Sequence, residues 1–368
     1  MAVRAYATQA REVLPTGFGV RSYAGLWLLV ASLSPVTFGH GRTEVEDALG
    51  LSAAEASDLA TELLAEERDD VDAAVAGWLR AGTLLPGGLP VRLGTLPDQP
   101  GLDAWAQAST RGRITSFPVT LTPETVLLLA SALVAETRWL EAMEVEDDRL
   151  LMDESGLLAV VDTTAAGLVA VAVPAGPGDL DVISVIAAEE LPQAQVWAAA
   201  DEVASWVIDG TLLERRVPAA TLAPGHAWHV VRERRSVPDG CAEVWDARLP
   251  AWSIDSSTDV VTAPGVGSVA SAVVSMIASG PLDVSCVQSA TATYASDGFD
   301  AAAVTVMAFM GSAGEPMTSR KVHHVSLSFD RPHAVVALAR GGAWEGVPLV
   351  HAWVDGASAP ARRSPSLG

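Results

Sequence analysis

The residues that could carry catalysis or bind a metal are few in this 368-residue chain. His226 and His229 are three positions apart, whereas a zinc-binding helix places its two histidines four positions apart and includes a glutamate. His323 and His324 are adjacent on an expected strand, so their side chains point to opposite faces. The chain contains no Gly-x-Ser-x-Gly turn for a nucleophilic serine. We therefore expect no catalytic residue, no metal and no cofactor.

One glycine pattern keeps a nucleotide-dependent oxidoreductase open as a distant alternative. Gly265, Gly267 and Ala270 have the spacing of a dinucleotide-binding turn, and Asp283 follows at about the distance of a ribose-binding acid. Such a turn needs a strand directly before the glycines and a βαβ unit around them. Here the preceding strand is expected to be very short, and Pro264 interrupts it. With 31 glycines in the chain, the pattern also arises readily by chance.

Charge narrows the possible partners. The chain has 23 basic and 45 acidic residues, and its net charge of −22 disfavours nucleic acid or an anionic membrane, because phosphate binding depends on Lys and Arg. The one basic segment contains Arg232, Arg234 and Arg235, and we interpret it as a solvated strand edge rather than a polyanion site. The two cysteines provide no disulfide framework.

Hydropathy bears on location and domain number. No apolar run reaches the roughly 18 residues that span a bilayer, and the first residues contain no apolar core of signal-peptide length. A cytoplasmic location is therefore expected, and an extracellular one stays open if the export signal is absent from this sequence or unusual. With 49% hydrophobic residues the chain can bury a large core. We expect a single domain over 1–368 and a monomer.

The most informative segment covers residues 288–332. Its first part alternates small, hydroxylated and apolar residues with period two up to Tyr294, which predicts a strand, and the following Ser-Asp-Gly ends that strand. A run of small residues begins at Ala301. A loop-like part over 311–320 and a second strand over 325–329 come next. The order is therefore strand, glycine hinge, alanine-rich segment, exposed loop and strand.

Other patterns predict the elements that surround this segment. Apolar periodicity predicts helices over 26–33, 44–51, 55–79 and 268–277, and we interpret the acidic outer face of the third as a solvated surface. Short runs rich in valine and alanine over 158–186, broken by proline and glycine, predict strands. No internal repeat and no low-complexity linker divides the chain.

These features together resemble the serpins, in which a reactive-centre loop enters a preformed sheet. The loop of that family corresponds here to about 298–324. Further segments are similar to family segments in the family's order: LDAWAQASTRGRI over 102–114, a central strand that ends in Trp139, LPAWSIDSSTDV over 249–260, GRTEVEDALGL over 41–51 and GVPLVHAWV over 346–354. The resemblance implies an α+β serpin-like fold with three β-sheets, about eight or nine helices and an exposed reactive-centre loop.

The resemblance also assigns roles within the loop. The hinge, which is the part that enters the sheet first, comprises Gly298, Phe299, Asp300, Ala301, Ala302 and Ala303. Counting the family's usual loop length from the hinge glycine places the scissile bond between Ser312 and Ala313, with the bond between Met310 and Gly311 as the alternative.

A second group of residues corresponds to positions that control opening of the sheet. The resemblance assigns this role to Ser22, Ser131, Gln288 and Trp139. Gln288 stands where the family has a histidine, and Ser131 stands where it has an asparagine. The family's Ser-Pro-x-Ser motif is reduced here to Ser22 alone. In the family these positions control how readily the sheet opens for the loop.

The hinge and the small residues after it have a pattern that suits insertion as a strand. One face would carry Phe299 and the alternate residues up to Phe309, and burying this row contributes on the order of 5–10 kcal/mol gross. Each new ladder hydrogen bond adds roughly 1 kcal/mol net. Phe299 replaces the family's hinge threonine, and its larger ring predicts about 1–3 kcal/mol of overpacking that would delay insertion.

The resemblance implies an inhibitor of serine proteases that acts by loop cleavage, covalent trapping and strand insertion. The protease supplies the catalytic groups. A small residue at Ser312 favours an elastase-like or subtilisin-like partner. The alternative is a non-inhibitory serpin-fold protein that binds a ligand or is simply cleaved as a substrate.

Overall fold

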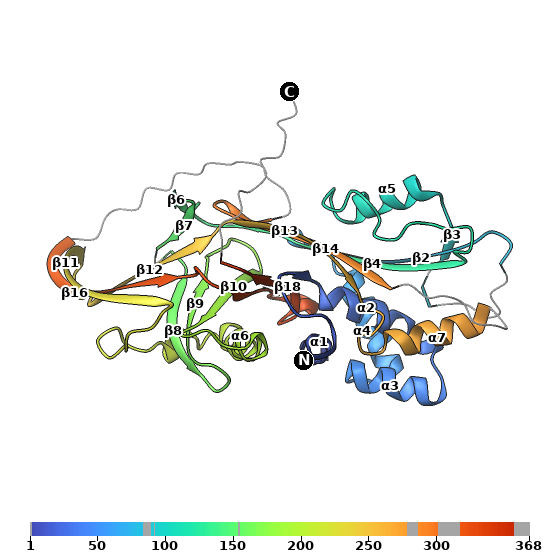
Figure 1. Ribbon diagram of the computed structural model, residues 1–368, viewed down its shortest axis with the longest axis horizontal. Coiled ribbons are helices and arrows are strands. Elements are labelled where there is room, and N and C mark those ends of the chain that lie inside the picture. The colour runs from blue at the N-terminus through green and yellow to red at the C-terminus, as the bar shows by residue number, and fades with distance from the viewer. Residues whose placement is uncertain are drawn as a thin grey trace, which may run out of the picture. The chain divides into compact units, whose positions relative to one another are not determined.

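Seven α-helices and four β-sheets occur in the described residues, which gives the protein an α+β fold (Figure 1). The computed structural model describes residues 2–83, 90–91, 93–153, 155–277, 286–300 and 317–356. By its packing the chain divides into two units. The first contains Met1–Glu136, Ile254–Thr291 and Ala337–His351, and the second contains Thr137–Ser253, Ala292–Val336 and Ala352–Gly368. The expected single domain stays a prediction.

Most of the helices belong to the first unit. The helix α2 is apolar on every side and almost wholly buried, with Trp27 inaccessible to solvent, and α1, α3, α4 and α7 pack around it. A capping box between Ser52 and Glu55 fixes the start of α4. The helices of this unit are α1 (Ala2–Val13), α2 (Tyr23–Leu33), α3 (Gly39–Leu49), α4 (Ala53–Ala65), α5 (Gln99–Ser109), α7 (Val266–Ile277) and the short η1 (Ser34–Val36) and η3 (Gly342–Trp344).

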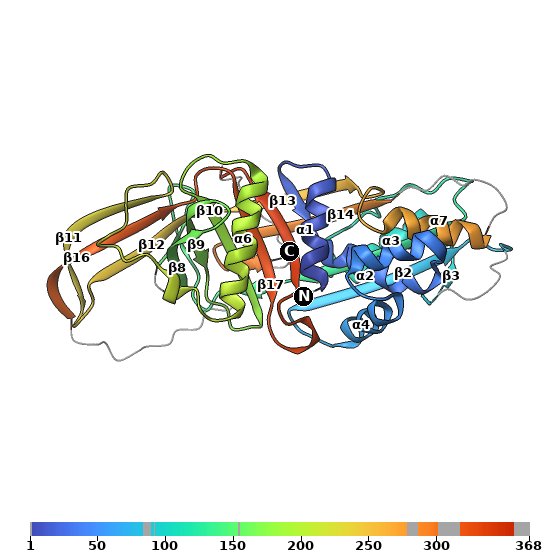
Figure 2. The same cartoon turned by 90° about the horizontal axis from the view of Figure 1, so that it is seen from below.

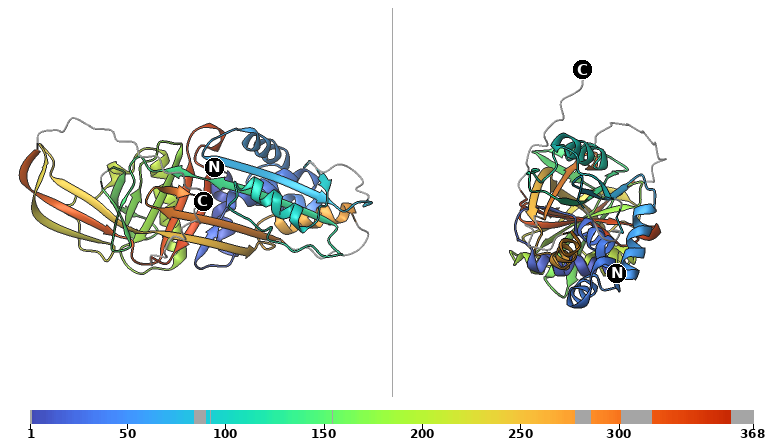
Figure 3. Two further views of the ribbon diagram at one scale, coloured as in Figure 1. Left: turned by 90° about the horizontal axis from the view of Figure 1, so that it is seen from above. Right: turned by 90° about the vertical axis from the view of Figure 1, so that its right-hand side faces the viewer.

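A three-stranded sheet in the same unit corrects one prediction. Its order is β3 (Leu93–Thr95), β2 (Val71–Leu79) and β4 (Leu127–Ala135). The helix predicted over 55–79 is wrong in its second half, because β2 pairs along its whole length with β4 and this pairing overrides the helical pattern. The helix α5 lies against this sheet (Figure 3). Its Trp105 packs edge-on against Trp78 of β2 at a centroid distance of 5.0 Å.

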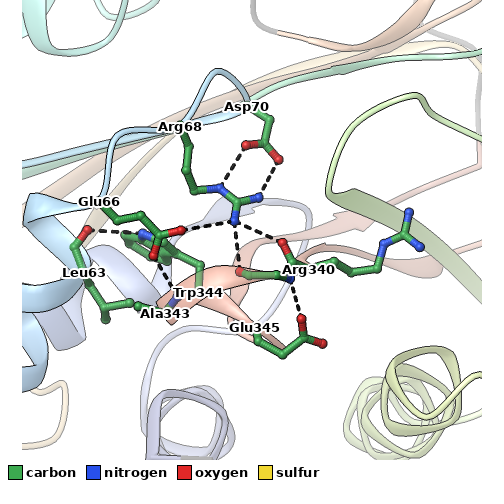
Figure 4. Close-up of polar contacts among 9 residues, drawn as sticks. Leu63, Glu66, Arg68, Asp70, Arg340, Ala343, Trp344 and Glu345 are labelled. Atoms are coloured by element: carbon green, nitrogen blue, oxygen red, sulfur yellow. Dashed lines mark hydrogen bonds and ion pairs between the residues drawn. The ribbon is translucent and has the colours of Figure 1, made fainter.

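Arg68 fixes the connection between α4 and β2. Its guanidinium donates to both carboxylate oxygens of Asp70, at 2.9 and 2.8 Å, and to the carbonyls of Arg340 and Gly341 (Figure 4). Nearby, the Trp344 indole donates to the Leu63 carbonyl at 3.1 Å. A cavity of about 270 Å³ lies beside this network. The network explains why α4 ends before Arg68.

The second unit is mainly β-structure. Its strands β8, β9 and β10 are almost completely buried, which confirms the strands predicted over 158–186, and the helix α6 lies along β10 (Figure 2). Its elements are β5 (Thr137–Arg138), β6 (Glu144–Glu146), β7 (Arg149–Met152), β8 (Leu157–Thr163), β9 (Gly167–Val173), β10 (Leu180–Ala187), α6 (Gln193–Ile208), η2 (Leu213–Arg215), β11 (Trp228–Pro238), β12 (Glu243–Pro250), β15 (Gly298–Asp300) and β16 (Met317–Ser328).

The remaining strands complete the sheets. They are β1 (Gly19–Arg21), β13 (Trp252–Asp259), β14 (Val287–Ala295), β17 (His333–Ala339) and β18 (Pro348–Val354). The three other sheets have the orders β1-β18-β17-β10-β9-β8, β11-β16-β12-β7-β6 and β13-β14-β15-β5. The structure thus has four sheets where three were expected, because β4 and β14 form ladders with different neighbours. The described residues contain seven α-helices, slightly fewer than expected.

The strand β16 begins earlier than predicted. The sequence predicted a loop up to residue 320 and a strand only from 325, but β16 starts at Met317 and pairs antiparallel with β11 along its whole length except for its last residue. Cross-strand pairing with β11 explains the difference, since the segment's own composition shows no strong strand signal. The predicted hinge at 301–303 and both candidate scissile bonds lie outside the described residues.

Candidate functional site

The hinge begins as a strand between two other strands. In β15, Phe299 pairs with Tyr294 of β14 on one side and with Thr137 of β5 on the other, and both pairings are antiparallel. The chain reaches this position through a two-residue turn after Ala295, where the sequence predicted the strand to end. The first residues of the predicted hinge are therefore already part of a sheet.

Gly298 occupies a position where only glycine fits without a shift of the backbone. A Cβ atom added to Gly298 would lie 2.5 Å from the Thr137 carbonyl oxygen, closer than real Cβ atoms approach. The turn before it is also held by the segment of β5: the Trp139 amide donates to the Asp297 carbonyl at 3.2 Å, and Arg138 forms an ion pair of 2.8 Å with Asp297. Gly298 permits the close approach of β15 to β5.

Four aromatic side chains, one of them the hinge residue Phe299, lie close together at the hinge. Phe299 packs edge-on against Trp252 with a centroid distance of 6.2 Å, and Trp252 stacks on Tyr294 at 5.9 Å. Trp139 lies 5.3 Å from Tyr294, and its indole donates to the Ala295 carbonyl at 2.9 Å. Only 2% of Phe299 is exposed. In this conformation the Phe299 ring is accommodated beside Trp252, and the delay of insertion predicted for it stays a prediction.

The Tyr294 hydroxyl lies within this apolar group. Burial raises the pKa of Tyr294 well above its ordinary value, and its hydroxyl has no hydrogen-bond partner among the described residues. The hydroxyl is therefore uncharged in the folded protein and serves as a packing group.

A second cluster, in the first unit, brings together the three remaining predicted residues. The Gln288 amide donates to the Ser22 carbonyl at 2.8 Å, and the Ser22 amide donates back to the Gln288 carbonyl oxygen at 3.2 Å. The Ser22 hydroxyl accepts from the Gly25 amide and caps α2. A Cβ atom added to Gly25 would lie 3.3 Å from the Ser22 hydroxyl and 3.5 Å from that of Ser131. We call Ser22, Ser131 and Gln288 the polar cluster.

Two buried histidines are additional polar groups that the sequence did not single out. Burial lowers the pKa of His333 to about 4, although its ring nitrogen Nδ1 is 2.8 Å from the Arg331 carbonyl oxygen. Burial, with a smaller contribution from Arg11, also lowers the pKa of His351, which packs against Tyr23 at 4.9 Å. Both rings are neutral near pH 7.

The adjacent histidines His323 and His324 lie on a strand, as the sequence predicted. His323 and His324 belong to β16, and the His324 ring contacts Asp246 through Nε2 and Glu233 through Nδ1, the second at 3.0 Å. In the described residues no group of three or more histidine, cysteine, aspartate or glutamate side chains has the arrangement of a metal site.

The glycine pattern of the oxidoreductase alternative has no room for a cofactor. A Cβ atom on Gly265 would lie 3.0 Å from Val30 and 3.6 Å from Ala48, so the turn packs directly against α2 and α3. The strand before it, β13, belongs to the sheet that contains the antiparallel β14 and β15. A dinucleotide-binding turn needs a parallel βαβ unit and an open helix start, and neither is found at this turn.

Sequence reasoning missed several residues of the hinge site. Trp252 stands in the segment LPAWSIDSSTDV, which was matched as a whole without a role for its tryptophan. The ion pair between Arg138 and Asp297 joins residues far apart in sequence and leaves no local signal. Alternation did place Tyr294 on a strand, but it could not show which rings would meet there.

Comparison with solved structures identifies the fold. Human glycosylated kallistatin matches with a TM-score of 0.63 and 16% identity over 95% of this chain and 94% of that chain. A complex of human thyroxine-binding globulin with thyroxine matches with a TM-score of 0.61 and 13% identity over 95% and 96%. Serpin48, a highly specific serpin of the insect Tenebrio molitor, matches with 0.60 and 14% over 96% of both chains.

These neighbours show the fold. The protein has the serpin fold, as the sequence segments indicated. No protein-family model matches the sequence, and no curated protein is significantly similar to it in sequence. In the described residues no helix is both long and apolar enough to cross a membrane.

Proposed function

We propose that the protein inhibits serine proteases by the serpin mechanism. The protease attacks the loop as a substrate, forms an acyl-enzyme through its own catalytic serine, and is carried along as the cleaved loop becomes a new strand. This protein contributes no catalytic group, since the bond-breaking chemistry belongs to the protease. Its contribution is a sheet that accepts the loop faster than the acyl-enzyme is hydrolysed.

The position of β15 is the observation that carries the proposal. Gly298 and Phe299 already pair on both sides, antiparallel to β14 and to β5. Residues that follow them in sequence could extend the same strand without a new nucleation step. Each added ladder hydrogen bond contributes roughly 1 kcal/mol net to the stability of the extended strand, and burial of the apolar face adds more.

The predicted scissile bond suggests which proteases would be trapped. A small residue at Ser312, before Ala313, suits a shallow specificity pocket of the elastase or subtilisin type. Met310 followed by Gly311 is the alternative and would suit an enzyme that accepts a longer apolar side chain. Cleavage after Arg320 is not expected to trap a protease, because Arg320 and Lys321 are already paired within β16.

The test is incubation with a panel of serine proteases followed by a denaturing gel and mass spectrometry. We expect a stable covalent band whose mass is the sum of the protease and the cleaved protein, together with a small C-terminal fragment that starts at Ala313. A fragment that starts at Gly311 moves the site to Met310. A fragment that starts at Lys321 or Val322, with the protease still active, contradicts the proposal.

The non-inhibitory alternative is favoured by the polar cluster. Gln288 forms two hydrogen bonds to Ser22 at the position of the family's histidine, and such bonds could keep the sheet closed. In that case every protease that cleaves the loop would be released unharmed. We also propose that the protein acts as a cytoplasmic monomer, which size-exclusion chromatography and fractionation of the source cells would test.

A further inference from the structure

The paired strands β11 and β16 carry a group of exposed basic residues. In the antiparallel register Arg234 lies directly opposite Lys321, and Arg232 lies opposite His323. Arg232, Arg234 and Lys321 are exposed. In a ladder, residues directly opposite one another project to the same face. We call Arg232, Arg234 and Lys321 the basic face.

The basic face has no counter-ions among the described residues. The next rung, Arg235 opposite Arg320, projects to the other face and does have them. Arg235 pairs with Glu233 at 2.6 Å, and Arg320 lies 3.7 Å from Asp239. Like charges directly opposite each other destabilise a strand pair. The same two strands therefore carry one compensated pair of cations and one uncompensated pair.

Protection of an exposed sheet edge does not explain this arrangement fully. β12 pairs with β16 only from His323 onward, so the ribbon before it has two open edges, and charged residues do discourage aggregation there. Either sign of charge serves that purpose. In a chain with 45 acidic and 23 basic residues, a cluster of one positive sign is unexpected and would attract an acidic surface.

The short stretch of chain between the predicted scissile bond and the basic face indicates which partner would reach that face. The predicted scissile bond ends at Ala313, and Lys321 comes eight residues later. Eight residues span at most about 30 Å when fully extended. A protease domain of roughly 250 residues is on the order of 45 Å across. A protease bound at the loop is therefore large enough to reach the basic face. A long polyanion would extend beyond it onto a surface with excess negative charge.

We propose that Arg232, Arg234 and Lys321 form a docking surface for an acidic face of the protease that attacks the loop. The inference rests on the proposed function, because the protease is brought there by the loop. The basic face would speed the encounter by electrostatic steering, and would thereby select proteases whose surface beside the active site is acidic. It would add to the selectivity given by the residue at the scissile bond.

The experiment uses a subtilisin-family protease with an acidic surface, with its catalytic serine replaced by alanine, so that no covalent step is required. Association rates with the full chain are measured by biolayer interferometry at 50 and 300 mM NaCl. The test variant is Arg234→Gln with Lys321→Gln. The matched control is Arg235→Gln with Arg320→Gln, which removes the same charge from the neighbouring rung. Unchanged melting temperatures confirm that both variants fold.

We expect the test variant to associate about tenfold more slowly than the wild type at 50 mM NaCl and within about twofold of it at 300 mM, where charges are screened. The control variant should stay within about twofold of the wild type at both concentrations. Equal rates for all three proteins, equal slowing of both variants, or no binding of the wild type would overturn the docking surface.

Two parallel measurements separate this inference from the proposed function. If active protease forms no covalent complex with any variant, inhibition is refuted, while the rates with the inactive protease still decide the docking surface. The second measurement is the retention of each variant on a heparin column. If the test variant alone loses retention on heparin while its association with the protease is unchanged, the basic face binds a sulfated polysaccharide and the proposal for a protein partner fails.

Discussion

The hinge site and the polar cluster hold different parts of β14 by different physical means. At its end, Tyr294 packs in a group of aromatic rings with Phe299 and Trp252, where contact area supplies most of the stabilisation. Near its start, Gln288 is held by two directional hydrogen bonds to Ser22. Apolar packing tolerates rearrangement as long as volume is conserved, whereas a hydrogen bond is lost when its geometry is lost.

The difference suggests a division of roles along the strand. The hinge site can hold the start of an inserting strand without an exact geometry, since rings of similar size still fill the space. The polar cluster must break its hydrogen bonds if β14 moves relative to α2. We therefore expect substitutions at the hinge site to change stability most, and substitutions in the polar cluster to change the rate of insertion.

The largest effect is expected for Phe299→Ala. Removing a fully buried ring costs about 3–5 kcal/mol, and the hinge loses its anchor between β14 and β5. Denaturant unfolding of the intact protein measures the loss. Phe18→Ala is the matched control, since Phe18 is 62% exposed and its replacement should cost less than about 0.5 kcal/mol. A cost at Phe299 no larger than that at Phe18 would show that the hinge is not held by its ring.

The next effect is the loss of stability in acid. The folded pKa of His333, about 4, lies below the ordinary value of 6.5, so its contribution to stability is complete above pH 6.5 and is lost as the pH falls toward 4. The difference corresponds to about 3 kcal/mol. His333→Phe should flatten the decline in that window. The decline will not vanish, because the pKa of His351 is lowered as well. An unchanged pH profile in the variant would show that His333 is accessible to water.

A smaller loss is expected for Gly298→Ala. The new Cβ atom would clash with the Thr137 carbonyl, and the backbone shift that relieves the clash costs about 1–3 kcal/mol. Gly41→Ala in α3 is the control, because its Cβ atom would be 3.7 Å from the nearest side chain and alanine favours a helix. Trapping of protease should fall along with stability. Equal stability of the Gly298 variant and the wild type would mean that β15 does not approach β5 closely.

The smallest change in stability is expected for Gln288→Leu. Loss of two hydrogen bonds costs about 1–2 kcal/mol net, since water replaces part of what is lost. Freeing β14 from Ser22 should also speed insertion and raise the fraction of protease trapped. A lower trapped fraction in Gln288→Leu would contradict the division of roles between the two clusters.

Much of the fold could be predicted from the sequence where signals are local or segments are long. Valine-rich runs predicted β8 to β10, and apolar periodicity predicted α7 almost to the residue. The segments typical of serpins indicated the family from the amino-acid sequence alone. The helix over 55–79 failed because its second half is stabilised by β4, more than fifty residues away, and the early start of β16 depends likewise on β11.

The residues of the candidate site also fall into those that a local sequence pattern could indicate and those that depend on distant parts of the chain. The resemblance singled out Gly298, Trp139 and Ser22, and the structure places Gly298 in β15 and Ser22 at the start of α2, while their roles in the opening of the sheet stay predictions. The sequence could not show that Phe299 would pack beside Trp252, which in turn stacks on Tyr294, and the predicted delay of insertion stays a prediction. Complementarity of this kind depends on residues far apart in sequence, and a pattern within one segment cannot reveal it.

The most direct test of the hinge as a partly inserted strand is the melting temperature before and after cleavage of the loop between residues 309 and 320. Cleavage is verified by mass spectrometry, and protein incubated with inactivated protease serves as the control. If the loop extends β15, the added 5–10 kcal/mol should raise the melting temperature by about 6–13 °C. An unchanged melting temperature after complete cleavage would show that the loop does not insert.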